Sequence, residues 1–226
     1  MTYGMDLLSN INKFIDQSAL KPNLTYQDIK NQCEIAIKYN FASLCVNPSH
    51  VKLCYEILKE SNVKVCSVVS FPFGLSTTDI KIKECIKALE DGAKELDIVW
   101  NISAFKSKDY DYVLQELKRI VKETKPAVTK IIVETAYLTE EEKIKALELV
   151  VESGADYIKT STGFAPSGAN LEDIKLWKRL VNDRIKIKAS GGIRNLETAI
   201  KFIEAGSDRI GTSSGVEIVK EAKENV

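Results

Sequence analysis

The sequence has no excess of charge of either sign, since 32 lysine and arginine residues balance 32 aspartate and glutamate residues in a chain of 226. A neutral chain has no overall electric field that would attract nucleic acid or an anionic membrane. Long apolar runs are also missing: the longest uncharged stretch, residues 65–78, contains proline and glycine and is too short to span a bilayer. We therefore expect no nucleic-acid or membrane partner, and any anion site must be local.

Signatures of metal binding, nucleotide binding and export are missing as well. The chain has one histidine, His50, and no CxxC pair among its five cysteines, so a zinc site is not indicated. No Gly-rich nucleotide motif occurs, and the N-terminal segment lacks the basic and apolar regions of a secretory signal. An odd number of cysteines in mostly apolar segments is typical of reduced core residues. The sequence predicts a cytoplasmic protein and indicates neither a zinc site nor a nucleotide-binding motif.

Short β-branched runs alternate with longer segments in which apolar residues recur every three or four positions. The short runs predict strands at residues 14–18, 42–47, 63–70, 95–101, 129–134, 157–162, 186–190 and 209–213. The longer segments predict helices at residues 25–39, 49–60, 78–91, 110–122, 139–153, 171–181, 196–204 and from 216 onwards. This alternation favours a wholly parallel sheet, either a closed (β/α)8 TIM barrel or an open doubly wound sheet.

A repeated joint favours the barrel. Gly92, Gly154 and Gly206 each follow a helical segment and precede a small residue, a short polar link and a strand, and Asn40 begins a degenerate copy. Glycine in a left-handed conformation ends a helix, so each copy marks the passage from helix to strand. Equivalent units around a ring are typical of a closed barrel. Since no linker divides the chain, we predict a single (β/α)8 domain over residues 1–226 with a short N-terminal extension.

The joints place charged residues at one depth of the predicted barrel. The fifth residue after the joint glycine is Asp97, Lys159 or Gly211, and Lys188 is a further strand lysine. An aspartate in mid-strand is costly to bury without a cation, so Asp97 is expected to pair with a lysine. The alternative interpretation is an aspartate that caps the next turn and lysines that are exposed to solvent.

Two lysines close together in a low-dielectric interior cannot both keep their protons cheaply, and a neutral amine forms Schiff bases with carbonyls. With an acid beside it, such an amine suits cleavage or formation of carbon–carbon bonds.

Two glycine-rich segments follow the last two predicted strands. They are Ser190-Gly-Gly-Ile-Arg and Gly211-Thr-Ser-Ser-Gly, and each leads into a helix. Backbone N–H groups, hydroxyls and a helix N-terminus bind anions, and TIM barrels commonly hold phosphate in these loops. The segments predict a phosphate site, unless the glycines serve only tight turns. Arg194 would either contact the phosphate or cap a carbonyl group.

Eight segments in order along the chain resemble one family. They lie at residues 15–22, 42–48, 65–74, 95–99, 130–135, 157–164, 187–194 and 209–215. The pair Lys-Thr-Ser-Thr-Gly, beginning at Lys159, and Lys-Ala-Ser-Gly-Gly-Ile-Arg, beginning at Lys188, is the most specific part of the match. In these segments the chain is similar to deoxyribose-phosphate aldolase, a class I aldolase.

The resemblance implies a TIM barrel that reversibly cleaves 2-deoxy-D-ribose 5-phosphate to D-glyceraldehyde 3-phosphate and acetaldehyde in deoxyribose phosphate catabolism, with no metal and no cofactor. It implies a homodimer or homotetramer that acts on small molecules. The implied catalytic residues are Lys159 for the Schiff base, Lys188 as the second lysine that helps to keep it uncharged, Asp97 as the proton-relay acid and Asp16, which holds Lys188. The implied substrate and phosphate residues are Thr162, Gly163, Gly191, Gly192, Arg194, Gly211, Ser213 and Ser214.

The chain departs from the family pattern at a few positions. Gln17, Ser18 and Ala19 stand where the first-strand motif usually has histidine, threonine and leucine, and Phe164 stands where some relatives have a charged residue. The lost titratable group and the added space keep two alternatives open. One is a sister class I aldolase with another sugar phosphate or an unphosphorylated substrate, and the other is a barrel that binds a phosphometabolite without catalysis.

Overall fold

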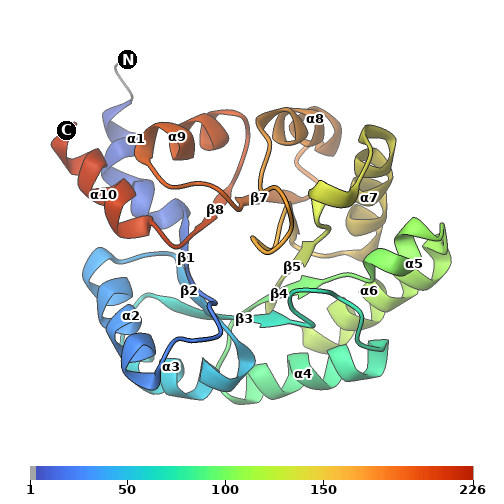
Figure 1. Ribbon diagram of the computed structural model, residues 1–226, viewed down its shortest axis with the longest axis horizontal. Helices are drawn as coiled ribbons and strands as arrows, with labels where there is room; N and C mark the ends of the chain where they lie inside the picture. Colours follow the sequence, from blue (N-terminus) through green and yellow to red (C-terminus); the bar gives the residue numbers. More distant parts are fainter. Residues whose placement is uncertain (1–3, 226) are drawn as a thin grey trace.

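The computed structural model describes residues 4–225, and its centre is a closed barrel of parallel strands (Figure 1). The strands follow one another around the ring in chain order, and β8 pairs with β1 to close it. The predicted TIM barrel is therefore confirmed and the open doubly wound sheet is excluded. The strands are β1 (Ile15–Ala19), β2 (Ser43–Val46), β3 (Lys64–Val69), β4 (Glu95–Val99), β5 (Val128–Ile132), β6 (Tyr157–Lys159), β7 (Lys186–Ser190) and β8 (Arg209–Thr212).

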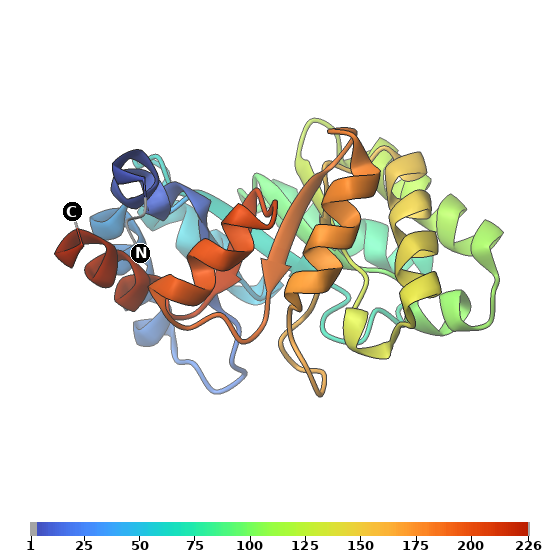
Figure 2. The same cartoon turned by 90° about the horizontal axis from the view of Figure 1, so that it is seen from above.

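Helices surround the barrel, as the ring in Figure 1 and the turned view in Figure 2 show. The predicted helices are present as α2 (Tyr26–Tyr39), η2 (Pro48–His50) with α3 (Val51–Leu58), α4 (Thr78–Glu90), α6 (Tyr110–Thr124), α7 (Glu140–Ser153), α8 (Leu171–Val181), α9 (Leu196–Glu204) and α10 (Gly215–Glu224). Shorter elements escaped the sequence pattern because they hold too few residues to show a period: α1 (Met5–Asn10), η1 (Ile11–Phe14), α5 (Ile102–Lys106) and η3 (Thr135–Tyr137). The first two form the N-terminal extension, and α1 packs beside α10.

The joints between helices and strands have the predicted geometry. Gly92, Gly154 and Gly206 have φ angles of 109°, 79° and 117°, and Asn40 has a φ of 51°. In each copy the next strand begins three residues later. This common spacing places the fifth residue of every copy at an equivalent strand position, and in two of the copies that residue is a charged one, Asp97 or Lys159.

The apolar core lies mainly between the strands and the helices. Outward-facing strand residues such as Ile98, Ile158 and Ile187 are buried there in one large hydrophobic cluster. Because successive side chains of a strand face opposite sides, the alternate positions point into the barrel. Inside the barrel the apolar residues form a second, small cluster, in which Cys45 and Cys66 take part. All five cysteines are buried and unpaired. Within residues 4–225, no helix is long and apolar enough to cross a membrane.

Candidate active site

A cavity of about 580 Å³ lies at the carboxyl ends of β1, β6, β7 and β8. Carboxyl ends of barrel strands are where TIM-barrel enzymes hold their active sites. Of the residues that the sequence proposed for a site, all but Asp97 and Ser214 line this cavity. They are Asp16, Lys159, Thr162, Gly163, Lys188, Gly191, Gly192, Arg194, Gly211 and Ser213.

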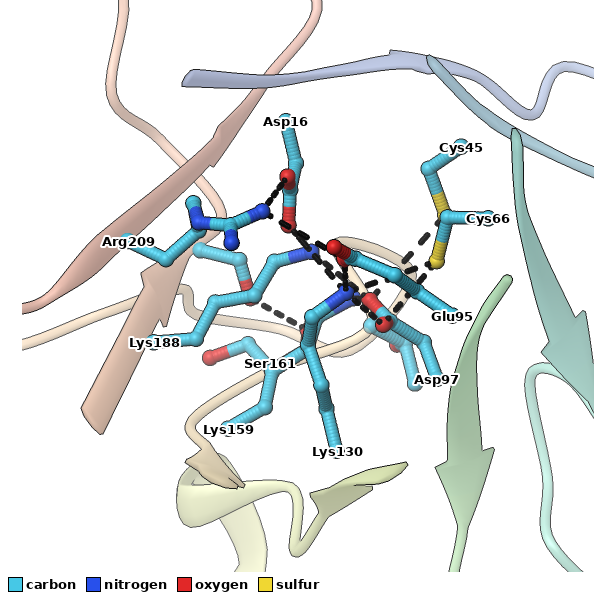
Figure 3. Close-up of polar contacts among 12 residues, drawn as sticks. Asp16, Cys45, Cys66, Glu95, Asp97, Lys130, Lys159, Ser161, Lys188 and Arg209 are labelled. Carbon is cyan, nitrogen blue, oxygen red and sulfur yellow. Dashed lines mark hydrogen bonds and ion pairs between the residues drawn. The ribbon is translucent and has the colours of Figure 1, made fainter. Parts of the chain in front are cut away.

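Charged side chains from six strands converge inside the barrel beside this cavity (Figure 3). Ion pairs link them into one network, which we call the charged cluster. A closed barrel covered by helices shields its interior from water, so each charge there needs a partner of opposite sign. The cluster comprises Asp16, Glu95, Asp97, Lys130, Lys159, Lys188 and Arg209.

Asp97 is the centre of the charged cluster and is fully buried. Its Oδ2 atom accepts hydrogen bonds from Lys159 Nζ and Lys188 Nζ, each at 2.7 Å. Its Oδ1 atom accepts one from Lys130 Nζ at 3.0 Å. The lysines that the sequence offered as alternative partners of Asp97 thus share one of its oxygen atoms.

Asp16 holds the far side of Lys188. Its Oδ2 atom lies 2.6 Å from Lys188 Nζ and 3.4 Å from Lys130 Nζ. Its Oδ1 atom accepts hydrogen bonds from Arg209 Nη1 at 2.5 Å and from Ser43 Oγ at 2.6 Å. Lys188 is therefore fixed between two carboxylates, Asp16 and Asp97.

The protonation states follow from these contacts. Burial by itself raises the pKa of Asp97, but the charges of Lys130, Lys159 and Lys188 outweigh it and hold that pKa well below its usual range. Burial lowers the pKa of Lys188, and the carboxylates of Asp16 and Asp97 more than offset this and hold it above the ordinary value. Asp97 is thus an anion and Lys188 a cation near neutral pH.

The cluster holds one more basic group than acidic groups, because three lysines and one arginine face three carboxylates. Lys130, Lys188 and Arg209 each pair with at least two carboxylates, whereas Lys159 pairs with Asp97 alone within the described part of the chain. Loss of one proton would make the buried cluster neutral. Lys159, which lines the cavity, is held by the fewest counter-charges.

The glycine-rich segments line the cavity, except for Ser214 and Gly215. Ser214 does not line it; the residue instead donates its backbone N–H to Thr212 Oγ1 at 2.9 Å and precedes α10. A residue larger than glycine would not fit at position 211. A Cβ atom there would lie 2.8 Å from Ser190 Cβ and 3.0 Å from Lys188 Cε. Gly211 therefore leaves room for the Lys188 side chain.

The departures from the family pattern have different consequences. Gln17 does not line the cavity; its side chain donates to the Ser213 carbonyl at 3.0 Å and accepts from the Gly215 N–H at 3.0 Å. It thus ties β1 to the loop before α10. Ser18, Ala19 and Phe164 do line the cavity.

One group of side chains has the spacing of metal ligands. Atoms of Cys45, Cys66 and Asp97 lie within 4.8 Å of one another. The Asp97 oxygens already accept from three lysine ammonium groups, which would repel a divalent cation. Burial and the hydrogen bond with Cys45 raise the pKa of the Cys66 thiol, so this residue stays protonated. These residues do not fit a metal ion, and Cys66 Sγ serves Asp97 Oδ1 as a donor at 3.2 Å.

Three members of the cluster were not singled out in the sequence: Glu95, Lys130 and Arg209. Each is a charged residue in a barrel strand, and its side chain faces the barrel interior, as those of Asp97, Lys159 and Lys188 do. Glu95 and Asp97, for example, are two residues apart in β4. Charged residues at even spacing within a predicted barrel strand were the signal that could have revealed them.

The barrel and the charged cluster indicate an enzyme. Comparisons with known proteins identify its class as aldolase. The family model described as "DeoC/LacD family aldolase" matches residues 9–221, and the chain belongs to this family. Deoxyribose-phosphate aldolase of Aquifex aeolicus is 56% identical over 212 residues, which cover 94% of this chain and 96% of that protein.

Other relatives agree with this. Deoxyribose-phosphate aldolase of Thermococcus gammatolerans is 53% identical over 97% of this chain and 98% of that protein. The solved structure of an aldolase called QR15 superposes with a TM-score of 0.93 at 55% identity, and the match covers 95% of this chain and 96% of that chain. A tetrameric deoxyribose phosphate aldolase from Aeropyrum pernix gives a TM-score of 0.88 at 32% identity, over 100% of this chain and 94% of that chain.

Proposed function

We propose that the protein is a deoxyribose-phosphate aldolase that works through a Schiff base on Lys159. It reversibly cleaves 2-deoxy-D-ribose 5-phosphate to D-glyceraldehyde 3-phosphate and acetaldehyde. One observation carries the proposal: the Lys159 amine faces the cavity and shares Asp97 Oδ2 with a second ammonium group, that of Lys188. An amine that faces the cavity with a carboxylate and an ammonium group beside it is suited to attack a carbonyl carbon and form a Schiff base.

The reaction begins at the Lys159 amine. This amine attacks C1 of the open-chain sugar, and loss of water leaves an iminium. The iminium draws the electrons of the C2–C3 bond toward nitrogen as the C3 hydroxyl loses its proton, which releases glyceraldehyde 3-phosphate and leaves an enamine. Protonation at C2 and hydrolysis release acetaldehyde and restore the amine. Asp97 lies within hydrogen-bond distance of both the Lys159 and the Lys188 nitrogens, so Asp97 and Lys188 would exchange the protons.

The glycine-rich segments that line the cavity would hold the phosphate group. Gly191 and Gly192 have positive φ angles and would offer backbone N–H groups, and Ser213 adds a hydroxyl group. Arg194 adds a positive charge and would pair with the phosphate. Gly163 lines the same space from the loop after β6. A phosphate bound there would leave the aldehyde end of the sugar free to reach Lys159, which lines the same cavity.

We further propose the setting in which the enzyme works. It acts in the cytoplasm as a single-domain subunit of a homodimer or homotetramer, on small molecules and without a metal or an organic cofactor. A relative of known structure from Aeropyrum pernix is described as tetrameric. The net charge of zero and the buried, unpaired cysteines support the cytoplasmic setting and the small-molecule partners.

Turnover with matched sugars tests the proposed substrate. The purified protein should release glyceraldehyde 3-phosphate from deoxyribose 5-phosphate, detected with a coupled dehydrogenase. It should process unphosphorylated deoxyribose at least about a hundredfold less efficiently, because a charge-assisted phosphate contact contributes a few kcal/mol. Equal efficiency with both sugars would instead favour the sister aldolase with an unphosphorylated substrate, for which the apolar Phe164 at the cavity gives a structural motive.

A further inference from the structure

Glu134 is a buried carboxylate that no step of the proposed reaction uses. It lies two residues after the end of β5, is 2% exposed, and has a left-handed backbone with a φ of 55°. This conformation is strained for a residue with a Cβ atom, and such strain persists where surrounding contacts hold it in place. The contacts are hydrogen bonds from Thr162: its backbone N–H donates to Oε1 at 3.2 Å, and its hydroxyl donates to Oε2 at 2.5 Å.

Thr162 links Glu134 to the site. It lies three residues after Lys159 and lines the same cavity. Its hydroxyl oxygen also accepts a hydrogen bond from the Phe164 N–H at 3.0 Å. A threonine hydroxyl has one proton and two lone pairs. With the proton committed to Glu134 and one lone pair to Phe164, one lone pair is left for the cavity.

We propose that Glu134 is a positioning residue that turns the Thr162 hydroxyl into a hydrogen-bond acceptor for a hydroxyl group of the substrate. The inference rests on the proposed function, since it is the three-carbon half of the sugar phosphate that carries hydroxyl groups. A substrate O–H group can donate a hydrogen bond to the free lone pair of the Thr162 hydroxyl oxygen. A phosphate or carbonyl oxygen at the same place has no proton to donate and is repelled by that lone pair. Glu134 thereby contributes to substrate orientation and to the choice of hydroxylated substrates.

The charge state of Glu134 determines this polarity. Burial raises the pKa of Glu134, while the hydrogen bonds from Thr162 and the charge of Lys159 act in the opposite direction. The Thr162 N–H can only donate, so it stabilises the carboxylate form. As a carboxylate, Glu134 can only accept, and the direction of the hydrogen bond from the Thr162 hydroxyl is then fixed.

Glu134→Gln tests the polarity with little change of shape. The glutamine oxygen can keep the backbone N–H of Thr162, and its amide nitrogen then donates to the Thr162 hydroxyl, which reverses that hydrogen bond. We expect the KM for deoxyribose 5-phosphate to rise about tenfold, as for the loss of one hydrogen bond, with kcat changed less than about threefold. Acetaldehyde has no hydroxyl group, so its borohydride-trapped adduct on Lys159 should still form in this variant, at a rate within about threefold of the wild type.

A double-mutant cycle separates this role from a structural one. Thr162→Val, which removes the hydroxyl, should raise KM as much as Glu134→Gln does, and the double variant should be no worse than either. Thr162→Ser keeps the hydroxyl and should keep KM within about threefold; this pair decides the question if Glu134→Gln fails to fold. Additive effects, an unchanged KM in Glu134→Gln, or loss of the acetaldehyde adduct in that variant would overturn the proposal. An inactive wild type that forms no adduct would refute the proposed function instead.

Discussion

Replacement of Lys188 by methionine should slow the formation of the Schiff base on Lys159. Methionine fills nearly the same space but removes the ammonium group that shares Asp97 Oδ2 with Lys159. Lys188 is a cation near neutral pH, because burial lowers its pKa but the carboxylates of Asp16 and Asp97 hold it above the ordinary value. It is therefore the proton donor beside the Lys159 amine when the carbinolamine loses water.

The magnitude follows from the geometry. Both nitrogens lie 2.7 Å from one oxygen, so they are separated by at most about 5.4 Å, and Lys188 is near enough to protonate a hydroxyl group that leaves next to the Lys159 nitrogen. A positioned general acid contributes about 10²–10⁴-fold to a rate. Activity near neutral pH should therefore fall at least about a hundredfold.

The assay is the rate of borohydride-trapped adduct formation with acetaldehyde at neutral pH. Lys81→Met is the matched control, because Lys81 is equally buried but pairs with Glu116 at 2.7 Å between α4 and α6. Loss of one partner from either buried pair should cost about 3–5 kcal/mol of folding free energy. The control should therefore lose stability and keep its rate of adduct formation. A folded Lys188→Met protein that forms the adduct at the wild-type rate would refute the account of Lys188.

Other substitutions test separate parts of the structure. Arg194→Met should raise the KM for deoxyribose 5-phosphate about tenfold to a hundredfold and leave that for deoxyribose unchanged; an equal effect on both sugars would count against a phosphate contact. Gly191→Ala, whose Cβ would lie 2.8 Å from Gly168 Cα at a φ of 88°, should lower Tm by several degrees in calorimetry; an unchanged Tm would contradict the close approach. Thr139→Ala removes the capping box with Glu142 and should cost about 1 kcal/mol, with turnover unaffected.

Much of the fold could be predicted because the local signals agree with the tertiary structure. The joints at Gly92, Gly154 and Gly206 each need a left-handed residue, and this chemical requirement leaves a visible mark in the sequence. The same spacing brought Asp97 and Lys159 to one depth. By contrast, α5 (Ile102–Lys106) is held by its place after β4 and by the Asn101 cap, and five residues are too few to display a helical period.

The site was predicted less completely than the fold. Asp97, Lys159 and Lys188 could be found because a buried charge within a strand conflicts with strand propensity. Arg209 and Lys130 are equally unusual, but their roles depend on which carboxylates they meet across the barrel, and Arg209 reaches Asp16, 193 positions away in the chain. The role of Gln17 also depends on a distant contact, with Gly215, and its substitution for histidine gave no hint of it. Such partners follow from barrel closure rather than from local sequence.

The position of the covalent adduct tests the central claim most directly. The protein is incubated with acetaldehyde, reduced with borohydride, digested and examined by peptide mass spectrometry. The account predicts a reduced two-carbon adduct on Lys159, with Lys130 and Lys188 unmodified because each is held by at least two carboxylates. An adduct on Lys188 or on another lysine, with Lys159 unmodified, would contradict it.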